Sequence, residues 1–165
     1  MGTRRSYARL TAVELGQALQ DRDWAKERLN SEDLDVDKAW SDIDIVFAYA
    51  GVNLEEHIGR HPIYVENAPG PDEYGWDEMS YVEKRGSDPY YLTPEQVLAV
   101  TPRITAIPFD VMFDSVDPAR VQELQDWQKA EWPDYRDYAT FHGVKAQRFF
   151  KHAAEAGDAI AVWFR

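Results

Sequence analysis

The segment Asp35–Ala50 constrains the fold most strongly, because its apolar residues fit either a strand or a helix. As a strand, "SDIDIVF" (41–47) alternates polar and apolar residues and places the carboxylates of Asp42 and Asp44 on one face, where they could bind a metal ion. As a helix, the whole segment carries one continuous apolar stripe with spacings of 4, 3, 4 and 3. The stripe consists of Val36, Trp40, Ile43, Phe47 and Ala50.

The helical interpretation accounts for more of the segment. Asp35 and Asp37 fall near the amino end, where the helix dipole favours negative charge, and Gly51 supplies a stop. We therefore expect a helix over residues 35–50, with Trp40 and Phe47 buried. Asp37, Ser41 and Asp44 are expected on the opposite, solvated face.

The strand interpretation would support an enzyme, because "SDIDIVF" resembles the metal-binding segment of small nucleotidyltransferases. In that family a Gly-Ser pair at a helix amino terminus, about ten residues upstream, holds the triphosphate. The upstream residues in this chain, "NSEDLDVDKAW", contain no glycine. A metal-dependent nucleotidyltransferase at Asp42 and Asp44 is thus considered and disfavoured, and we predict no metal site and no cofactor.

The two ends of the sequence predict strands, and the chain between them reads mainly as helix. Residues 4–10 and 159–165 have the composition of short strands. Thr11 and Glu14 form a capping box that opens the first helix. The sequence therefore predicts an α+β fold: a single compact domain over 1–165, mostly helical, with a small sheet formed by the N- and C-terminal strands.

Two further helices have clear boundaries. Thr93 caps one, with Pro94 at its first position and Gln96 completing a capping box. A long helix is expected over 134–156, ended by Gly157. Its expected buried residues are Tyr138, Phe141, Val144, Ala146, Phe149 and Phe150.

The charge balance limits the classes of partner. The 165 residues include 30 acidic and 18 basic ones, a net charge of −12, and no cysteine. Such a charge argues against binding nucleic acid or a membrane surface; it suits a basic protein partner, but it is explained more simply by solubility. The absence of cysteine excludes disulfides and thiolate sites. Because no secretory signal or long apolar run is present, we expect a cytoplasmic protein; the oligomeric state stays open.

The histidines do not form a recognisable metal site. His57 and His61 are four residues apart, but Gly59 lies between them and Pro62 follows, so a chance pair is favoured over a zinc site. We expect His142 and His152, which lie on the predicted long helix, to be on its surface.

Residues 66–89 form an irregular acidic loop in this interpretation, with three prolines, three glycines and seven acidic residues. Large rings within and around it are candidates for a binding surface, although a role in fixing the loop to the core is slightly favoured. These candidates are Tyr74, Trp76, Tyr81, Tyr91, Trp132 and Tyr135. The favoured function is a non-catalytic protein-binding or regulatory domain. A small enzyme of unknown reaction and a component of a structural oligomer are the alternatives.

The segment "LDVDKAW" (34–40), followed by "YLTPEQV" at 91–97, "EWPDY" and the tail "FFKHAAEAGDAIAVWF", resembles the YfbM-like family of bacterial proteins, a domain of unknown function. This resemblance implies a compact α+β fold and a bacterial source, and it implies no activity. It also implies that Asp35, Asp37, Lys38 and Trp40 are signature residues with a structural role. Asp44 departs from the family pattern, which commonly has histidine at this position.

Overall fold

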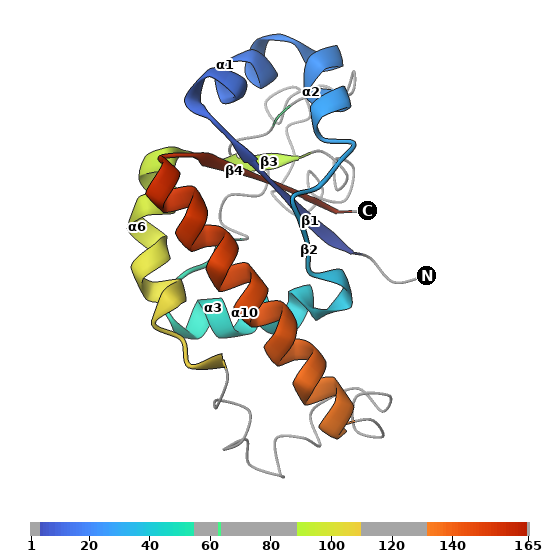
Figure 1. Cartoon of the computed structure of the whole chain (residues 1–165), viewed down its shortest axis with the longest axis vertical. Coiled ribbons are helices and arrows are strands. Elements are labelled where there is room, and N and C mark those ends of the chain that lie inside the picture. The colour runs from blue at the N-terminus through green and yellow to red at the C-terminus, as the bar shows by residue number, and fades with distance from the viewer. Residues whose placement is uncertain (1–3, 55–62, 64–88, 110–131, 165) are drawn as a thin grey trace, which may run out of the picture.

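A computed structural model describes residues 4–54, 63, 89–109 and 132–164 (Figure 1). The helices and strands in these ranges are β1 (Arg5–Leu10), α1 (Ala12–Gln20), α2 (Arg22–Arg28), β2 (Leu34–Asp35), the 3-10 helix η1 (Asp37–Ala39), α3 (Trp40–Tyr49), β3 (Tyr90–Leu92), α6 (Pro94–Thr105), α10 (Trp132–Ala156) and β4 (Ala159–Phe164). The predicted α+β class is confirmed, and the strands at both ends of the sequence pair in one sheet.

The sheet has the strand order β2-β1-β4-β3, and every neighbouring pair is antiparallel. Tyr7 lies opposite Leu34 on one side and opposite Val162 on the other, and Val162 in turn lies opposite Tyr90. One row of side chains therefore crosses all four strands. Because side chains alternate along a strand, the residues on either side of this row point to the other face of the sheet.

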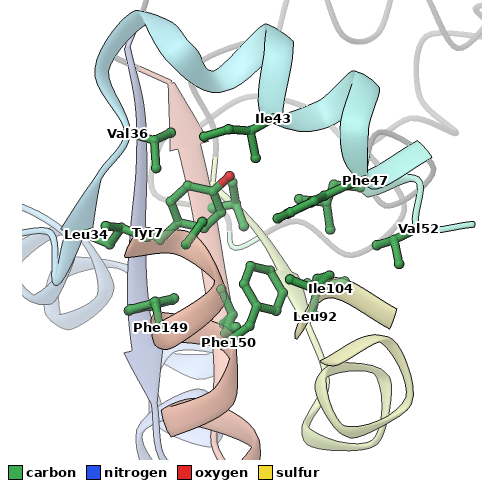
Figure 2. Packing of buried hydrophobic residues seen from close by; sticks show 14 of the residues in the cluster. Tyr7, Leu34, Val36, Ile43, Phe47, Val52, Leu92, Ile104, Phe149 and Phe150 are labelled. Carbon is green, nitrogen blue, oxygen red and sulfur yellow. The ribbon is translucent and has the colours of Figure 1, made fainter. Parts of the chain in front are cut away.

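The two faces of the sheet are both buried and belong to two apolar clusters. The face of Tyr7 packs against α3, α6 and α10, with Phe47, Phe149 and Phe150 around it (Figure 2). The Tyr7 ring extends from β1 toward α3 and meets Phe149 and Phe150 at ring-centroid distances of 6.0 and 6.3 Å. The opposite face packs against α1 and α2. Its buried strand residues include Ala8, Leu10, Ala159, Ala161 and Trp163.

Helices α6 and α10 are held together by side chains that approach closely. The Cβ that an alanine would add at Gly143 would lie 2.4 Å from the ring of Phe109, so the glycine makes room for this ring against α10. The Gln147 side chain donates to the carbonyls of Ile104 and Ile107, at 2.8 and 2.6 Å. Because the last carbonyls of a helix lack partners within it, Gln147 satisfies the end of α6.

The predicted helix boundaries are confirmed at three positions. Thr11 and Thr93 each accept a hydrogen bond from the backbone N–H of the third residue of their helix, and the side-chain oxygens of Glu14 and Gln96 accept one from the backbone N–H of the threonine. Gly157 ends α10 with a φ of 71°, in the left-handed region that glycine adopts without strain.

Two predictions about helical residues are wrong. The helix expected from residue 35 begins as an α-helix only at Trp40, because Leu34 and Asp35 pair with β1 as an edge strand and η1 intervenes. Phe141 was expected in the core, but 59% of it is exposed. The broad apolar content of α10 exceeds what one helix face can bury.

Candidate functional site

The first residue of β1 places an arginine inside the protein. Arg5 points to the same face of the sheet as Tyr7 and its side chain is fully buried. Its Nη1 forms an ion pair and hydrogen bond with Oδ1 of Asp44, which comes from α3. The guanidinium also lies 5.0 Å from the centroid of the Trp40 ring, a cation–π distance. The pair therefore joins the sheet to the helix above it.

Two phenols complete this group of side chains, which we call the Arg5 cluster: Arg5, Tyr7, Trp40, Asp44 and Tyr90. Burial raises the pKa of Tyr7 to about 12, although the Arg5 cation opposes this change. Burial disfavours the charged form of Arg5, but the nearby Tyr7 and Tyr90 oxygens and the Asp44 carboxylate outweigh it, so the pKa of Arg5 stays above its ordinary value. At physiological pH the cluster holds the Arg5 cation, paired with the Asp44 carboxylate, and the neutral phenol of Tyr7.

The signature residues form a turn beside this cluster. The backbone N–H of Asp37 donates to Oδ1 of Asp35 at 2.6 Å, and Asp37 has a φ of 47°, which is uncommon for a residue other than glycine. Arg4 lies 3.2 Å from the Asp37 carboxylate and 3.8 Å from that of Asp35. Trp40, expected to be buried, is only half-buried, and one side of its ring faces Arg5. The side chain of Lys38 lies outside the described residues.

Both aspartates of the predicted pair lie on the α3 helix, and the side chain of Asp42 is outside the described set. The expectation that Asp44 lies on a solvated face is wrong, because its side chain is only 14% exposed and is paired with Arg5. The reason is that an arginine on β1 needs a counter-ion, which the helical pattern alone does not reveal.

His142 is also placed differently from the prediction. It was expected on the helix surface, but it is 9% exposed, whereas His152 is exposed as expected. The His142 ring packs edge-on against Tyr138 and Phe141, at 4.5 and 5.2 Å between centroids. It lies on the side of α10 that contacts β2 and η1.

The aromatic residues nominated for binding are only partly described. Tyr91 lies in β3 rather than in a loop and packs half-buried against the α1–α2 face. Trp132 and Tyr135 lie in the first turns of α10, and their side chains are outside the described set. Tyr74, Trp76 and Tyr81 lie outside the described residues, as do the predicted acidic loop up to residue 88 and the pair His57 and His61.

Sequence reasoning overlooked the centre of the site. Arg5 and Tyr7 were treated only as residues of the N-terminal strand. A usable signal was present, since Arg5 and Arg9 share one face of this strand with Tyr7. An arginine in such a strand is rarely buried without a counter-ion.

Comparison with known proteins assigns the chain to a family. The model of a domain of unknown function (DUF1877) matches residues 1–163. The chain belongs to the DUF1877 family. No curated protein and no solved structure matches this DUF1877 chain.

Two further findings concern the described part of the DUF1877 chain alone. It contains no group of three or more His, Cys, Asp or Glu residues placed to hold a metal ion. None of the helices in it has the length and apolar character needed to cross a membrane.

Proposed function

We propose that this DUF1877 protein is a single, non-catalytic binding domain whose partner is a basic protein. The resemblance of its signature segment leads us to propose also that it belongs with the YfbM-like bacterial proteins and works in the cytoplasm. The observation that carries the proposal of a basic partner is the uneven distribution of charge along the chain.

Most of the acidic excess lies in two stretches of sequence. Residues 55–88 and 110–131 hold 15 of the 30 acidic residues and 5 of the 18 basic ones, a net charge of −10 out of −12. The rest of the chain holds 15 acidic and 13 basic residues and is nearly neutral. A concentrated acidic field steers a basic partner toward the stretches that carry it.

The signature residues, in contrast, are engaged in contacts that support the fold. The Trp40 ring lies against the Arg5 guanidinium, and both Asp35 and Asp37 face Arg4. Side chains that are engaged in contacts between the sheet and the helices are poorly placed to bind or react with a substrate. This supports a structural role for the signature and assigns recognition to the acidic stretches and the rings Tyr74, Trp76 and Tyr81 that the first of them contains.

Two sets of substitutions with the same change of charge test the proposal. The first set, Asp72→Asn, Glu73→Gln and Asp77→Asn, neutralises part of the first acidic stretch. The matched set, Asp23→Asn, Glu27→Gln and Glu155→Gln, neutralises three exposed side chains of α2 and α10. A third bait carries Tyr74→Ala, Trp76→Ala and Tyr81→Ala.

Each bait captures proteins from bacterial lysate, and the association rate of the purified partner is then measured over a range of salt concentrations. We expect the first and third baits to bind more slowly or more weakly than the wild type, and the matched bait to resemble it. The wild-type rate should fall as salt screens the field. Equal rates for both charge-matched baits, or a rate independent of salt, would contradict the proposal.

A small enzyme is the second candidate, and the Arg5 cluster is the observation in its favour. A buried arginine next to a tyrosine with a strongly raised pKa is a combination that active sites use. Native mass spectrometry of the purified protein tests this candidate. A metabolite that co-purifies with the wild type but is absent from a folded Tyr7→Phe variant would place the enzyme ahead of the binder.

A further inference from the structure

We propose that His142 is a proton-sensitive contact that fastens α10 to the signature turn of Asp35 and Asp37. The proposal is independent of the proposed binding function. It rests on the position of the imidazole ring, on the partners of its two nitrogens, and on the charges that face it.

The ring is enclosed at the place where α10 crosses the edge of the sheet. His142 is 9% exposed, and α10 contacts both β2 and η1 in this region. Tyr138 and Phe141 flank the ring on its own helix. The next residue, Gly143, lets the Phe109 ring approach α10 closely, so this part of the helix has little room to shift.

The hydrogen bonds of the ring define its neutral form. The backbone of Asp35 forms a hydrogen bond with the imidazole, and it favours the charged ring, so the backbone carbonyl is the acceptor. Nδ1 is buried and has no hydrogen-bond partner among the described atoms, so the donor is Nε2–H. The proton of neutral His142 is therefore on Nε2, and Nδ1 carries a buried lone pair.

Protonation of this lone pair would create a buried N–H group. Because no described acceptor faces Nδ1, the new donor would lose its hydrogen bonds to water without replacement. The cost would be relieved if the signature turn moved away from His142 and admitted water. A fall in pH should thus loosen this contact before it affects the rest of the sheet.

Charged and titratable groups surround the ring from three directions. On α10 itself these are Tyr138 and Lys145, from β2 and η1 they are Asp35 and Asp37, and Arg4 pairs with both aspartates. Burial and then the Lys145 ammonium lower the pKa of His142 below its ordinary value of 6.5. The two aspartates oppose this change without reversing it.

The direction of the pH effect follows from this balance. In the unfolded chain His142 takes up a proton near its ordinary pKa, whereas in the folded protein it remains neutral to lower pH. Its contribution is therefore complete above about pH 6.5 and is lost as the pH falls toward the folded-state pKa. Over that window the unfolding equilibrium constant should rise by up to about ten-fold for each pH unit.

The experiment compares the wild type with His142→Gln and with the matched variant His152→Gln, which changes an exposed histidine of the same helix. Urea unfolding is measured between pH 7 and pH 5. We expect wild type and His152→Gln to lose stability in parallel and His142→Gln to lose less. An unchanged pH dependence in His142→Gln would overturn the proposal.

Two measurements on the wild type alone keep the test decisive if His142→Gln fails to fold. In an NMR titration the midpoint of His142 should lie below the ordinary histidine value of 6.5; an equal or higher midpoint would overturn the proposal. Amide exchange should lose protection in the signature turn and in the part of α10 around His142 as the pH falls. A loss spread evenly over β1 and β4 would show that His142 is not a local contact.

Discussion

Arg5 and Arg9 lie on the same face of β1, one near each end of the strand. Each is paired with an aspartate, but the two pairs differ in burial. Arg5 is fully buried and paired with Asp44 from α3, with an aromatic ring against its guanidinium. Arg9, at the other end, is 34% exposed and places Nη2 and Nε 2.6 and 2.8 Å from Oδ2 of Asp158. The two arginine–aspartate pairs therefore differ in how far the arginine depends on its partner. Water can replace the partner of Arg9 but cannot reach Arg5.

The Arg9 end is a network at the edge of the core. The carbonyl of Arg9 accepts a hydrogen bond from Arg28 at 2.9 Å, and its N–H donates to Asp33 at 2.7 Å. Glu14, which closes the capping box of α1, lies 3.6 Å from Arg28. At this end several partially exposed charged groups interact with one another. At the other end Arg5 and Asp44 form a buried pair.

Asp44→Asn should have the largest effect, because it removes the anion and leaves the Arg5 cation buried. We expect a loss of about 3–5 kcal/mol in the free energy of unfolding, measured by urea denaturation. The double variant Arg5→Met/Asp44→Leu is the control, and it should lose less than Asp44→Asn because no buried charge remains. If Asp44→Asn lowers the free energy of unfolding by less than about 1 kcal/mol, the buried pair contributes no more than an exposed one would.

The ionisation of Tyr7 at high pH should lower the free energy of unfolding through the Arg5 end of β1. The unfolded chain releases the Tyr7 proton near pH 10 and the folded protein near pH 12, so stability is complete below pH 10 and falls between pH 10 and 12. The loss should be on the order of 2–3 kcal/mol, from a pKa difference of about two units. Unfolding is measured across this range in the wild type and in Tyr7→Phe. If the variant keeps the same alkaline loss, another group is responsible.

Asp158→Asn breaks the matching pair at the Arg9 end. We expect a loss of about 1–2 kcal/mol, because Arg9 keeps access to water and the amide oxygen of asparagine can still accept one hydrogen bond. The comparison with Asp44→Asn under the same conditions is the measurement. Equal losses at both ends would mean that burial does not control the strength of these pairs.

Thr11→Ala should have the smallest effect. It removes the capping side chain of α1 near the Arg9 end, and we expect a loss of about 1 kcal/mol. Thr93→Ala makes the same change at the start of α6, on the other side of the sheet, and should cost a similar amount. Thermal unfolding of the two variants compares them. A large difference would show that caps, like ion pairs, depend on their surroundings in this fold.

The parts of the fold that local chemistry controls could be predicted from the sequence. The capping boxes at Thr11 and Thr93 and the stop at Gly157 were confirmed because each depends on a few neighbouring residues. The end strands were confirmed because their composition and alternation are local properties. Periodicity also placed Phe47 in the core correctly.

The candidate site could not be predicted in the same way, because its members come from distant parts of the chain. Asp44 meets Arg5 across 39 positions, and His142 meets the turn of Asp35 and Asp37 through tertiary packing. The start of the signature helix was placed too early for a related reason. Leu34 and Asp35 are extended because β1 offers them an edge to pair with, which outweighs their helical pattern.

The pairing of β1 with β4 sets the order in which this chain can acquire its structure. Arg5 faces Phe164 and Leu10 faces Ala159, so the central strands are separated by most of the sequence. During synthesis at 5–20 residues per second, β4 is added roughly 8–30 s after β1. Throughout that interval β1 lacks its central neighbour and can pair only with β2. The nascent chain therefore remains open to misfolding and to chaperones until its last strand has been made, and closing so long a loop should make its folding slow.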